Sequence, residues 1–240
     1  MSKGLMRLYF DGVYNRAYDR TVARLSPYRR LQARCLDMLE LNGDKSILCV
    51  GVGTGNEVLG ILERNGTGNL SIIGVDTSMS GLGRACRKAQ GRGKEIGALI
   101  MDAHRLGFRD GSFDMVLCFH LMGFLEYDRR ATGEMFRVLK ERGQFVITYP
   151  CGGGVRGLAT EVARSVLHSL KAGRWGEALK EALAGLGAWA VYMPLSFWMK
   201  PNPGFYSRRD LEALLSSFRP GGYTIEEDPV YQDFIVHGRK

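Results

Sequence analysis

A glycine-rich loop between an apolar run and a helical stretch constrains the fold of this chain more than any other feature. The loop reads Val50-Gly51-Val52-Gly53-Thr54-Gly55-Asn56 and follows the apolar residues 47–50. Glycine permits a tight turn and a close approach of the backbone to a ligand, because no Cβ stands in the way. The first amides of the following helix point towards such a ligand. A strand, a glycine turn and a helix in this order are typical of a nucleotide-binding α/β fold.

Apolar runs alternate with helical stretches between residues 46 and 150. The runs are almost continuously apolar and cover residues 47–50, 70–75, 96–101, 113–118 and 144–149. The helical stretches between them cover residues 57–64, 80–90 and 126–139. Continuous apolar runs are typical of parallel strands that are buried on both faces. The alternation therefore predicts an α/β fold with a doubly wound, mostly parallel sheet.

This alternation divides the chain into four segments. A basic, helical entry segment covers residues 1–45, and the α/β core covers residues 46–150. Residues 151–206 are expected to form a helical, apolar cap inserted after the fifth strand, with helices over 161–170 and 175–186 and a turn at 201–204. Residues 207–240 supply a last helix over 207–218, opened by a capping box of Ser207 and Asp210, and closing strands over 223–227 and 230–236.

Positive charge is concentrated near the N-terminus. The 240 residues carry a formal net charge of +8, and residues 1–34 hold eight Lys or Arg residues against Asp11 and Asp19, an excess of six. Two explanations stay open, a solvated helix face and an electrostatic footprint for a membrane surface or an anionic substrate.

The cysteines indicate the compartment. There are five, an odd number, and no two form a Cys-x-x-Cys pair. This usage favours a reducing compartment and argues against structural zinc. Since residues 1–10 also lack a long apolar run, we expect a cytoplasmic protein without a metal site.

The segment 182–199 has no charged residue in eighteen positions. That length is near the lower limit for a membrane span, but Pro194, Gly185, Gly187 and Ser196 argue against a regular spanning helix. The segment is therefore interpreted first as a cap packed over the sheet, then as an apolar patch in peripheral contact with a membrane, and last as a true span.

Two acidic residues follow the second and third apolar runs. Asp76 comes 21 residues after Gly55, where a carboxylate can accept both hydroxyls of a ribose. Asp102 and Ala103 occupy the matching place after the third run, where a carboxylate and an amide can contact an adenine edge. The loop is Gly-x-Gly-x-Gly, and the sixth position is Asn56 instead of the glycine of a dinucleotide fingerprint, which disfavours a nicotinamide oxidoreductase.

Several strings in this order resemble one family. They are VGVGTGN, IIGVDTS, MDAHRLGFRDGSFDMVLC and EMFRVLKERGQFVIT, all between residues 46 and 150. The chain resembles the class I S-adenosylmethionine-dependent methyltransferases, and most closely their small-molecule subgroup of quinone C-methyltransferases and phospholipid N-methyltransferases. The resemblance implies a Rossmann-like seven-stranded sheet and S-adenosylmethionine as the cofactor. It also implies that the entry segment around Tyr18 closes over the methionine end of that cofactor.

The resemblance assigns roles residue by residue. The cofactor-binding set is Tyr18, Gly51, Gly53, Gly55, Asp76, Thr77, Ser78, Asp102, Ala103 and Phe119. The acceptor pocket is expected to involve Tyr14, His120, Trp189 and Tyr192. His120 is the candidate base, and its alternative role is that of a pocket or core histidine without proton transfer.

One departure from the family pattern affects the cofactor. The family has Asp or Glu two residues before the first glycine, and this chain has Cys49. That acid organises the loop and helps to hold the ammonium of the cofactor, and hydrogen bonds to charged groups contribute roughly 1.5–3 kcal/mol. Cys49 therefore predicts weaker cofactor binding unless another group compensates.

The sequence thus predicts in-line methyl transfer to a small, lipophilic acceptor such as a quinone, an isoprenoid or a lipid. Nucleic acid is disfavoured as a substrate, because residues 119–122 read Phe-His-Leu-Met where base-amine methyltransferases carry an Asn/Asp-Pro-Pro-aromatic string. The alternative that Cys49 leaves open is a non-catalytic binding or regulatory protein with a methyltransferase fold.

Overall fold

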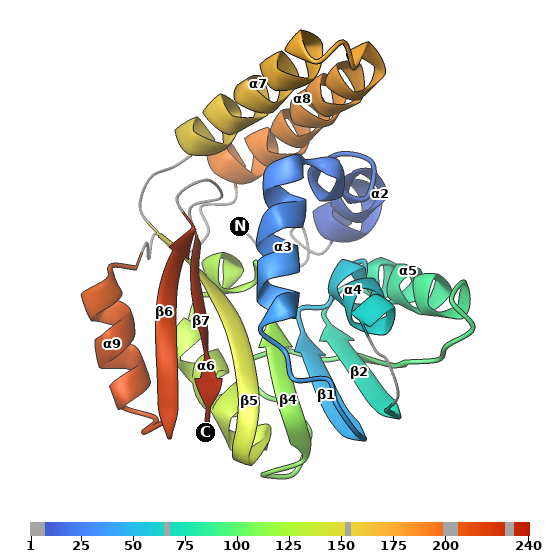
Figure 1. The fold of residues 1–240 in the computed structure, drawn as a ribbon. Coiled ribbons are helices and arrows are strands. Elements are labelled where there is room, and N and C mark those ends of the chain that lie inside the picture. Colours follow the sequence, from blue (N-terminus) through green and yellow to red (C-terminus); the bar gives the residue numbers. More distant parts are fainter. Residues whose placement is uncertain (1–7, 65–67, 152–154, 199–205, 229–232) are drawn as a thin grey trace.

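One seven-stranded sheet forms the centre of the computed structural model, which describes residues 8–64, 68–151, 155–198, 206–228 and 233–240 (Figure 1). Its strand order is β3-β2-β1-β4-β5-β7-β6. The strands are β1 (Lys45–Val50), β2 (Leu70–Asp76), β3 (Gly97–Ile100), β4 (Phe113–Cys118), β5 (Leu139–Pro150), β6 (Gly222–Asp228) and β7 (Asp233–Arg239).

The pairing confirms the predicted doubly wound, mostly parallel sheet. Strands β1 to β5 pair in parallel, and β7 enters antiparallel between β5 and β6. The chain order reverses at β1 and β4, so their carboxyl ends flank a switch point, where ligands bind in open α/β sheets. The glycine loop begins at this switch point.

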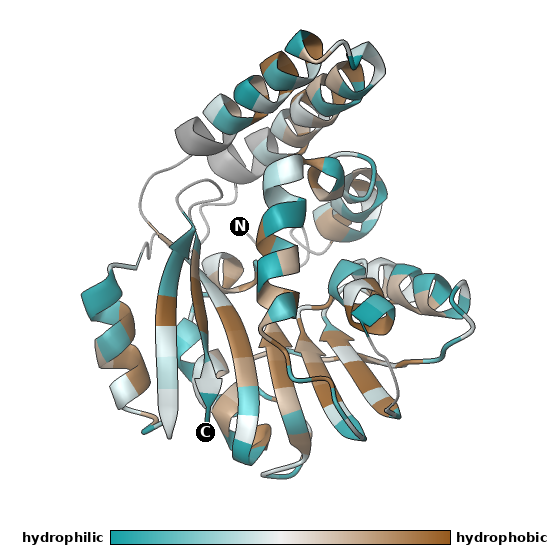
Figure 2. Ribbon diagram, viewed as in Figure 1, coloured by the Kyte–Doolittle hydropathy of each residue, from teal (hydrophilic) through white to brown (hydrophobic). Residues whose placement is uncertain are grey.

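Helices cover both faces of the sheet, and β1 illustrates why. Ile47 and Cys49 pack in one core with helices α3 (Ser26–Asp37), α4 (Asn56–Arg64) and α5 (Met79–Gln90). Leu48 and Val50 pack in the other core with helices α6 (Asp128–Val138) and α9 (Arg208–Ser216). All four strand residues are buried, which explains why the run is continuously apolar (Figure 2).

Short N-terminal elements lie above the carboxyl ends of the central strands (Figure 1). They are the π-helix η1 (Phe10–Tyr14), α2 (Asn15–Tyr18) and the 3₁₀-helix η2 (Val22–Arg24). A further 3₁₀-helix, η3 (Met122–Phe124), follows β4. Part of the basic charge of the entry segment is used internally, because Arg30 pairs with Glu161 and Arg34 pairs with Glu226 and Asp228.

Two antiparallel helices, α7 (Val155–Lys171) and α8 (Trp175–Trp198), project beyond the N-terminal elements as a hairpin (Figure 1). The hairpin is expected from the sequence to pack over the sheet, and this prediction is wrong, because the hairpin packs chiefly on the N-terminal elements. Backbone Ser26 N and side-chain Ser26 Oγ donate to the Glu181 carboxylate at 2.9 and 3.0 Å. No helix in the described ranges has both the length and the apolar character that a membrane span requires.

Several boundaries differ from the sequence-based expectation. Helix α8 continues to Trp198 instead of ending at Leu186, since its glycines serve as points of close approach. A Cβ on Gly185 would lie 2.9 Å from Val162 Cγ1, and one on Gly187 would collide with Thr21. The predicted capping box is present, with Ser207 and Asp210 bonded reciprocally. The predicted turn at 201–204 and the first residues of the predicted strand 230–236 lie outside the described residues.

Candidate functional site

The glycine loop turns sharply at the carboxyl end of β1, and its glycines are needed for different reasons. Gly53 has φ +48°, and the nearest atom to a Cβ built there would be Gly51 O at 3.9 Å, so this side of the loop is open. Gly55 has φ +76°, and a Cβ there would lie 2.6 Å from Ala85 Cβ. Gly53 thus presents bare backbone to a ligand, whereas Gly55 lets α5 approach the loop.

Asp76 connects the end of β2 to this loop. Its Oδ2 accepts from Gly53 N at 2.8 Å, and its Oδ1 accepts from Ser78 N at 2.8 Å. Burial raises the pKa of Asp76, and the backbone hydrogen bonds oppose that rise. The backbone amide of Thr77 also hydrogen-bonds to this carboxylate. A carboxylate has about four acceptor sites, so one remains for a hydroxyl of a ligand.

The residues expected around an adenine lie at the ends of β2 and β3. Met101 N donates to Asp76 O at 3.0 Å, which holds the two strand ends together. Asp102 is 54% exposed in its side chain and accepts from His104 N at 2.9 Å, while Ala103 is buried. Ser78 caps α5 by accepting from Gly81 N, and Thr77 is exposed beside it.

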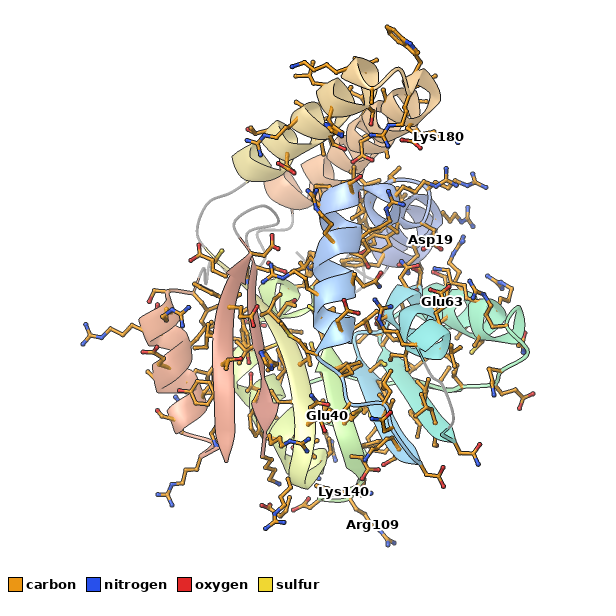
Figure 3. All side chains as sticks on the ribbon, viewed as in Figure 1. Asp19, Glu40, Glu63, Arg109, Lys140 and Lys180 are labelled. Atoms are coloured by element: carbon orange, nitrogen blue, oxygen red, sulfur yellow. The ribbon has the colours of Figure 1, made fainter. Side chains whose placement is uncertain are left out.

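The N-terminal segment closes over the loop at two points. Asp11 and Asn15 bond to the start of α5, where the Asp11 carboxylate accepts from Ser80 N at 3.1 Å and Asn15 Nδ2 donates to Ser78 Oγ at 2.7 Å. Asp19 lies between the N-terminal helices and α4 (Figure 3). Its Oδ1 accepts from Thr54 Oγ1 and from Lys88 Nζ, both at 2.7 Å.

His120 is held in an unusual conformation directly after β4. Its φ of +55° lies in the left-handed region, which costs about 1–3 kcal/mol for a residue other than glycine. A hydrogen bond stabilises this conformation, because His120 N donates to Thr148 Oγ1 at 2.8 Å. His120 Nδ1 lies 2.8 Å from Oδ2 of the buried Asp233, the first residue of β7. Strained backbone and a histidine–carboxylate pair are both concentrated at active sites.

Aromatic rings form a continuous series from α8 to His120. Tyr192 contacts Tyr14, Tyr14 contacts Tyr18, Tyr18 contacts Tyr28, and Tyr28 contacts His120, with centroid distances of 6.1, 5.2, 5.8 and 5.3 Å. Tyr14 and Tyr28 are buried. The structure therefore brings Tyr14, Tyr18, Tyr192 and His120 together.

Two predicted residues lie apart from this series. The side chain of Trp189 is 58% exposed on α8. Phe119 is partly buried and packs against the core on the face of the sheet covered by α3, α4 and α5. The structure therefore does not add Trp189 to the ring series.

Sequence reasoning missed several residues of this region. Glu57 is buried in the first turn of α4, and Lys88 reaches from α5 to Asp19. Asp19 stands in the entry segment and Glu57 directly follows the glycine loop, so both carried a local signal. Asp233 carried none, because it reaches His120 only through the antiparallel return of β7.

Comparison with known proteins finds similarity to methyltransferases. Residues 48–147 match a family model described as a methyltransferase domain. A demethylmenaquinone methyltransferase of Thermus thermophilus is 32% identical over 119 residues, which are 49% of this chain and 53% of that protein. The chain thus spans about half the length of this curated relative.

Solved structures share the fold. A SAM-dependent methyltransferase of Thermotoga maritima superposes with a TM-score of 0.63 at 17% identity, covering 98% of this chain and 99% of that one. A magnesium protoporphyrin IX methyltransferase of Synechocystis, solved with bound SAH, has a TM-score of 0.63 at 15% identity and covers both chains fully, at 100% each. At these identities the similarity concerns the fold alone.

The two glycines give the first testable prediction. Gly53→Ala leaves the loop uncrowded and lowers the free energy of unfolding by about 1 kcal/mol through its positive φ, yet it weakens binding of S-adenosylhomocysteine because the new methyl group fills the open side of the loop. Gly55→Ala lowers the free energy of unfolding by more, about 2–3 kcal/mol, through the clash with Ala85. Urea unfolding and calorimetric titration measure both effects. Equal ligand affinity in Gly53→Ala and the wild type would contradict the ligand-facing role of Gly53.

Proposed function

We propose that this chain, whose residues 48–147 match a methyltransferase domain model, is a class I S-adenosylmethionine-dependent methyltransferase acting on a small, lipophilic acceptor. The observation that carries the proposal is the carboxylate of Asp76 bonded to the amide of Gly53, beside the open side of the glycine loop. A demethylmenaquinone methyltransferase among the relatives supports an acceptor of quinone type.

The residues of the loop region fit the cofactor. Bare backbone at Gly53 lets an adenosyl thioether approach the loop closely, and Asp76 keeps an acceptor site for a ribose hydroxyl. We assign Gly51, Gly55, Thr77, Ser78, Ala103 and Asp102 to the same site, as the family resemblance implies. S-adenosylmethionine, when bound, supplies a methyl group on a sulfonium that is already activated. The protein then has to align the acceptor and exclude water.

His120 and Asp233 fit the removal of a proton from the acceptor. The Asp233 carboxylate beside Nδ1 favours the tautomer with its proton on Nδ1, so that Nε2 carries the lone pair. That nitrogen is the site where His120 accepts a proton from a phenol or an enolisable ring carbon. Asp233 is a positioning residue that also stabilises the imidazolium that forms.

The ring series from Tyr192 to His120 supports a lipophilic acceptor. Aromatic rings offer an apolar wall whose hydroxyls still fix orientation, and Tyr14 Oη lies 3.4 Å from Tyr192 Oη. Burial raises the pKa of Tyr14 well above its ordinary value, so this hydroxyl stays protonated and available as a donor. We assign Tyr14, Tyr18 and Tyr192 to the acceptor site.

We also propose that the hairpin docks peripherally on an anionic bilayer. Its exposed apolar side chains on α8, the hairpin stripe, share one helix face and are 58–70% exposed: Trp175, Leu179, Leu183, Leu186 and Trp189. Lys171 and Lys180 are exposed around the same end, where Arg174 pairs with Glu177, and Lys180 lies far from the sheet (Figure 3). An exposed apolar face with basic neighbours is typical of helices that lie in the membrane interface.

Calorimetric titration with S-adenosylhomocysteine tests whether the chain binds the cofactor product, which is the first requirement of the activity. Binding in the micromolar range, lost in Asp76→Ala, is expected because that variant removes the partner of Gly53 and of the ribose. Methyl transfer from labelled S-adenosylmethionine to a lipid extract is then the direct assay. Binding without transfer to any extract would favour the non-catalytic alternative that Cys49 suggests, and absence of binding near millimolar ligand would contradict the proposal.

Asp233→Asn is expected to lower the rate of methyl transfer about 10- to 100-fold and to change its pH profile, while the affinity for S-adenosylhomocysteine stays unchanged. The physical reason is the loss of the carboxylate that orients His120. His120→Asn is the companion variant. It removes the base itself and should therefore abolish the part of the pH profile that depends on this base. An unchanged pH profile in both variants would leave His120 as a pocket residue only.

Flotation with vesicles of phosphatidylcholine and phosphatidylglycerol checks the membrane surface. Leu179→Glu and Leu186→Glu should each reduce the floated fraction severalfold, because a charge on the hairpin stripe opposes its insertion. Ala213→Glu adds the same charge on an exposed position of α9 and serves as the matched control. Equal flotation of all variants, or a dimer in sedimentation that Leu179→Glu dissociates, would overturn membrane docking by this face.

A further inference from the structure

The position that should carry an acid at the end of β1 carries a neutral thiol. Cys49 is 1% exposed, and burial raises the pKa of its thiol well above the ordinary value. A buried neutral thiol cannot balance the positive charge of an amino-acid ammonium. If the proposed function holds, on which this inference rests, another group must supply a carboxylate near the methionine end of the ligand.

Glu57 is a buried carboxylate beside Cys49. It stands in the first turn of α4, directly after the glycine loop, and is 8% exposed. Its charge adds to burial in raising the pKa of Cys49 on β1, of Cys118 on β4 and of Tyr28 on α3. These three side chains come from the elements that surround the switch point, so Glu57 lies among them.

The helix start explains this acid only in part, because Glu57 accepts from its own backbone amide in the first turn of α4, yet its side chain is buried there. Glutamate is almost never fully buried without a partner, and Glu63 of the same helix is exposed. Burial raises the pKa of Glu57 from 4.5 to about 8, and the hydrogen bond from its own backbone amide and the charge of Lys88 oppose this rise only in part. Because the folded chain binds the proton more tightly than the unfolded chain, stability is lost as the pH rises from about 4.5 towards 8. The carboxylate therefore costs stability near neutral pH, as is common for groups kept for function.

Lys88, whose charge lowers the pKa of Glu57, is already engaged by other groups. Lys88 Nζ donates to Asp19 Oδ1 and to Asn56 Oδ1, both at 2.7 Å, and lies 3.3 Å from Thr54 Oγ1. These bonds use the three donors that an ammonium has. A second cation brought by a ligand would complete the charge balance around Glu57.

We propose that Glu57 binds the α-ammonium of the amino-acid end of the adenosyl ligand, in the place of the acid that β1 lacks. Glu57 is thus an ammonium-binding residue of the cofactor site, moved from the strand to the helix that follows the glycine loop. Through Glu57, the site prefers adenosyl thioethers that have an amino-acid chain over those that lack one.

Two ligands that differ only at that end separate the roles. S-adenosylhomocysteine has the ammonium, and 5′-methylthioadenosine has the same adenosyl thioether without the amino-acid chain. Glu57→Gln should weaken S-adenosylhomocysteine binding about 10- to 100-fold and leave 5′-methylthioadenosine binding unchanged. Asp76→Asn is the matched control and should weaken both, since both ligands have the ribose.

Rescue at position 49 provides the second test. Cys49→Asp in the Glu57→Gln background should restore most of the lost affinity for S-adenosylhomocysteine, because it returns a carboxylate to the strand. In the wild-type background the same change should improve affinity less, since two neighbouring carboxylates repel each other. Urea unfolding should find Glu57→Gln at least as stable as the wild type, which excludes misfolding as the cause.

Proton release gives a readout that is independent of affinity. The groups that act on Glu57 or are affected by it are Lys88 on α5, Asp76 on β2, Tyr28 on α3, Cys49 on β1 and Cys118 on β4. With a pKa of about 8, Glu57 is mostly protonated near neutral pH, so binding of an ammonium to its ionised form releases a proton. Titrations in buffers of different ionisation enthalpy should detect this proton in the wild type and not in Glu57→Gln.

The outcomes are distinguishable. If Glu57→Gln weakens both ligands equally, or weakens neither, Glu57 has no role at the ammonium and the inference is overturned while the proposed function stands. If the wild type binds neither ligand, the proposed function itself fails.

Discussion

The hydrogen bond from the Gly53 amide to the Asp76 carboxylate is the interaction on which the site depends. It joins the turn after β1 to the end of β2, at the edge where the strand order reverses. The second oxygen of the same carboxylate accepts from Ser78 N, so one side chain sets the start of α5 as well. A buried carboxylate is costly unless backbone amides satisfy it, and here those amides belong to the parts that must be held for a ligand.

The N-terminal segment completes this arrangement from outside the sheet. Its polar side chains, from Asp11, Asn15 and Asp19, hydrogen-bond to the start of α5 and to the glycine loop. The rings of Tyr14 and Tyr18 lie towards the candidate site. The entry segment is therefore a wall of the site. The hairpin is tied to this wall in turn, which links a surface far from the sheet to the region of the ligand.

Charge is placed differently from what a simple count suggests. Arg30 and Arg34 pair with carboxylates of the hairpin and of β6, so a part of the basic excess holds the fold together. The acids of the candidate site, Asp76, Glu57 and Asp233, are largely shielded from water and act on neighbouring groups at short range. Shielded charges interact more strongly than exposed ones, and this is why few residues suffice to define the chemistry.

The sequence by itself determined the sheet, the loop and the place of Asp76. Continuous apolar runs indicated the parallel strands, although the run that forms β3 is largely exposed at the edge of the sheet. A turn made of glycines between strand and helix leaves few alternatives. The capping box at Ser207 was equally visible, because it depends on two residues three positions apart. Interactions of this kind are local, so their residues lie close together in the chain.

Only the tertiary structure decided the partners that come from distant segments. Asp233 reaches His120 through an antiparallel strand more than a hundred residues later, and Tyr192 of the hairpin meets Tyr14 of the N-terminal segment. The continuation of α8 past its glycines was likewise hidden, since those glycines fit the close approach of Val162 and are not breaks. Such contacts depend on how whole elements pack, and neither periodicity nor spacing in the chain records that packing.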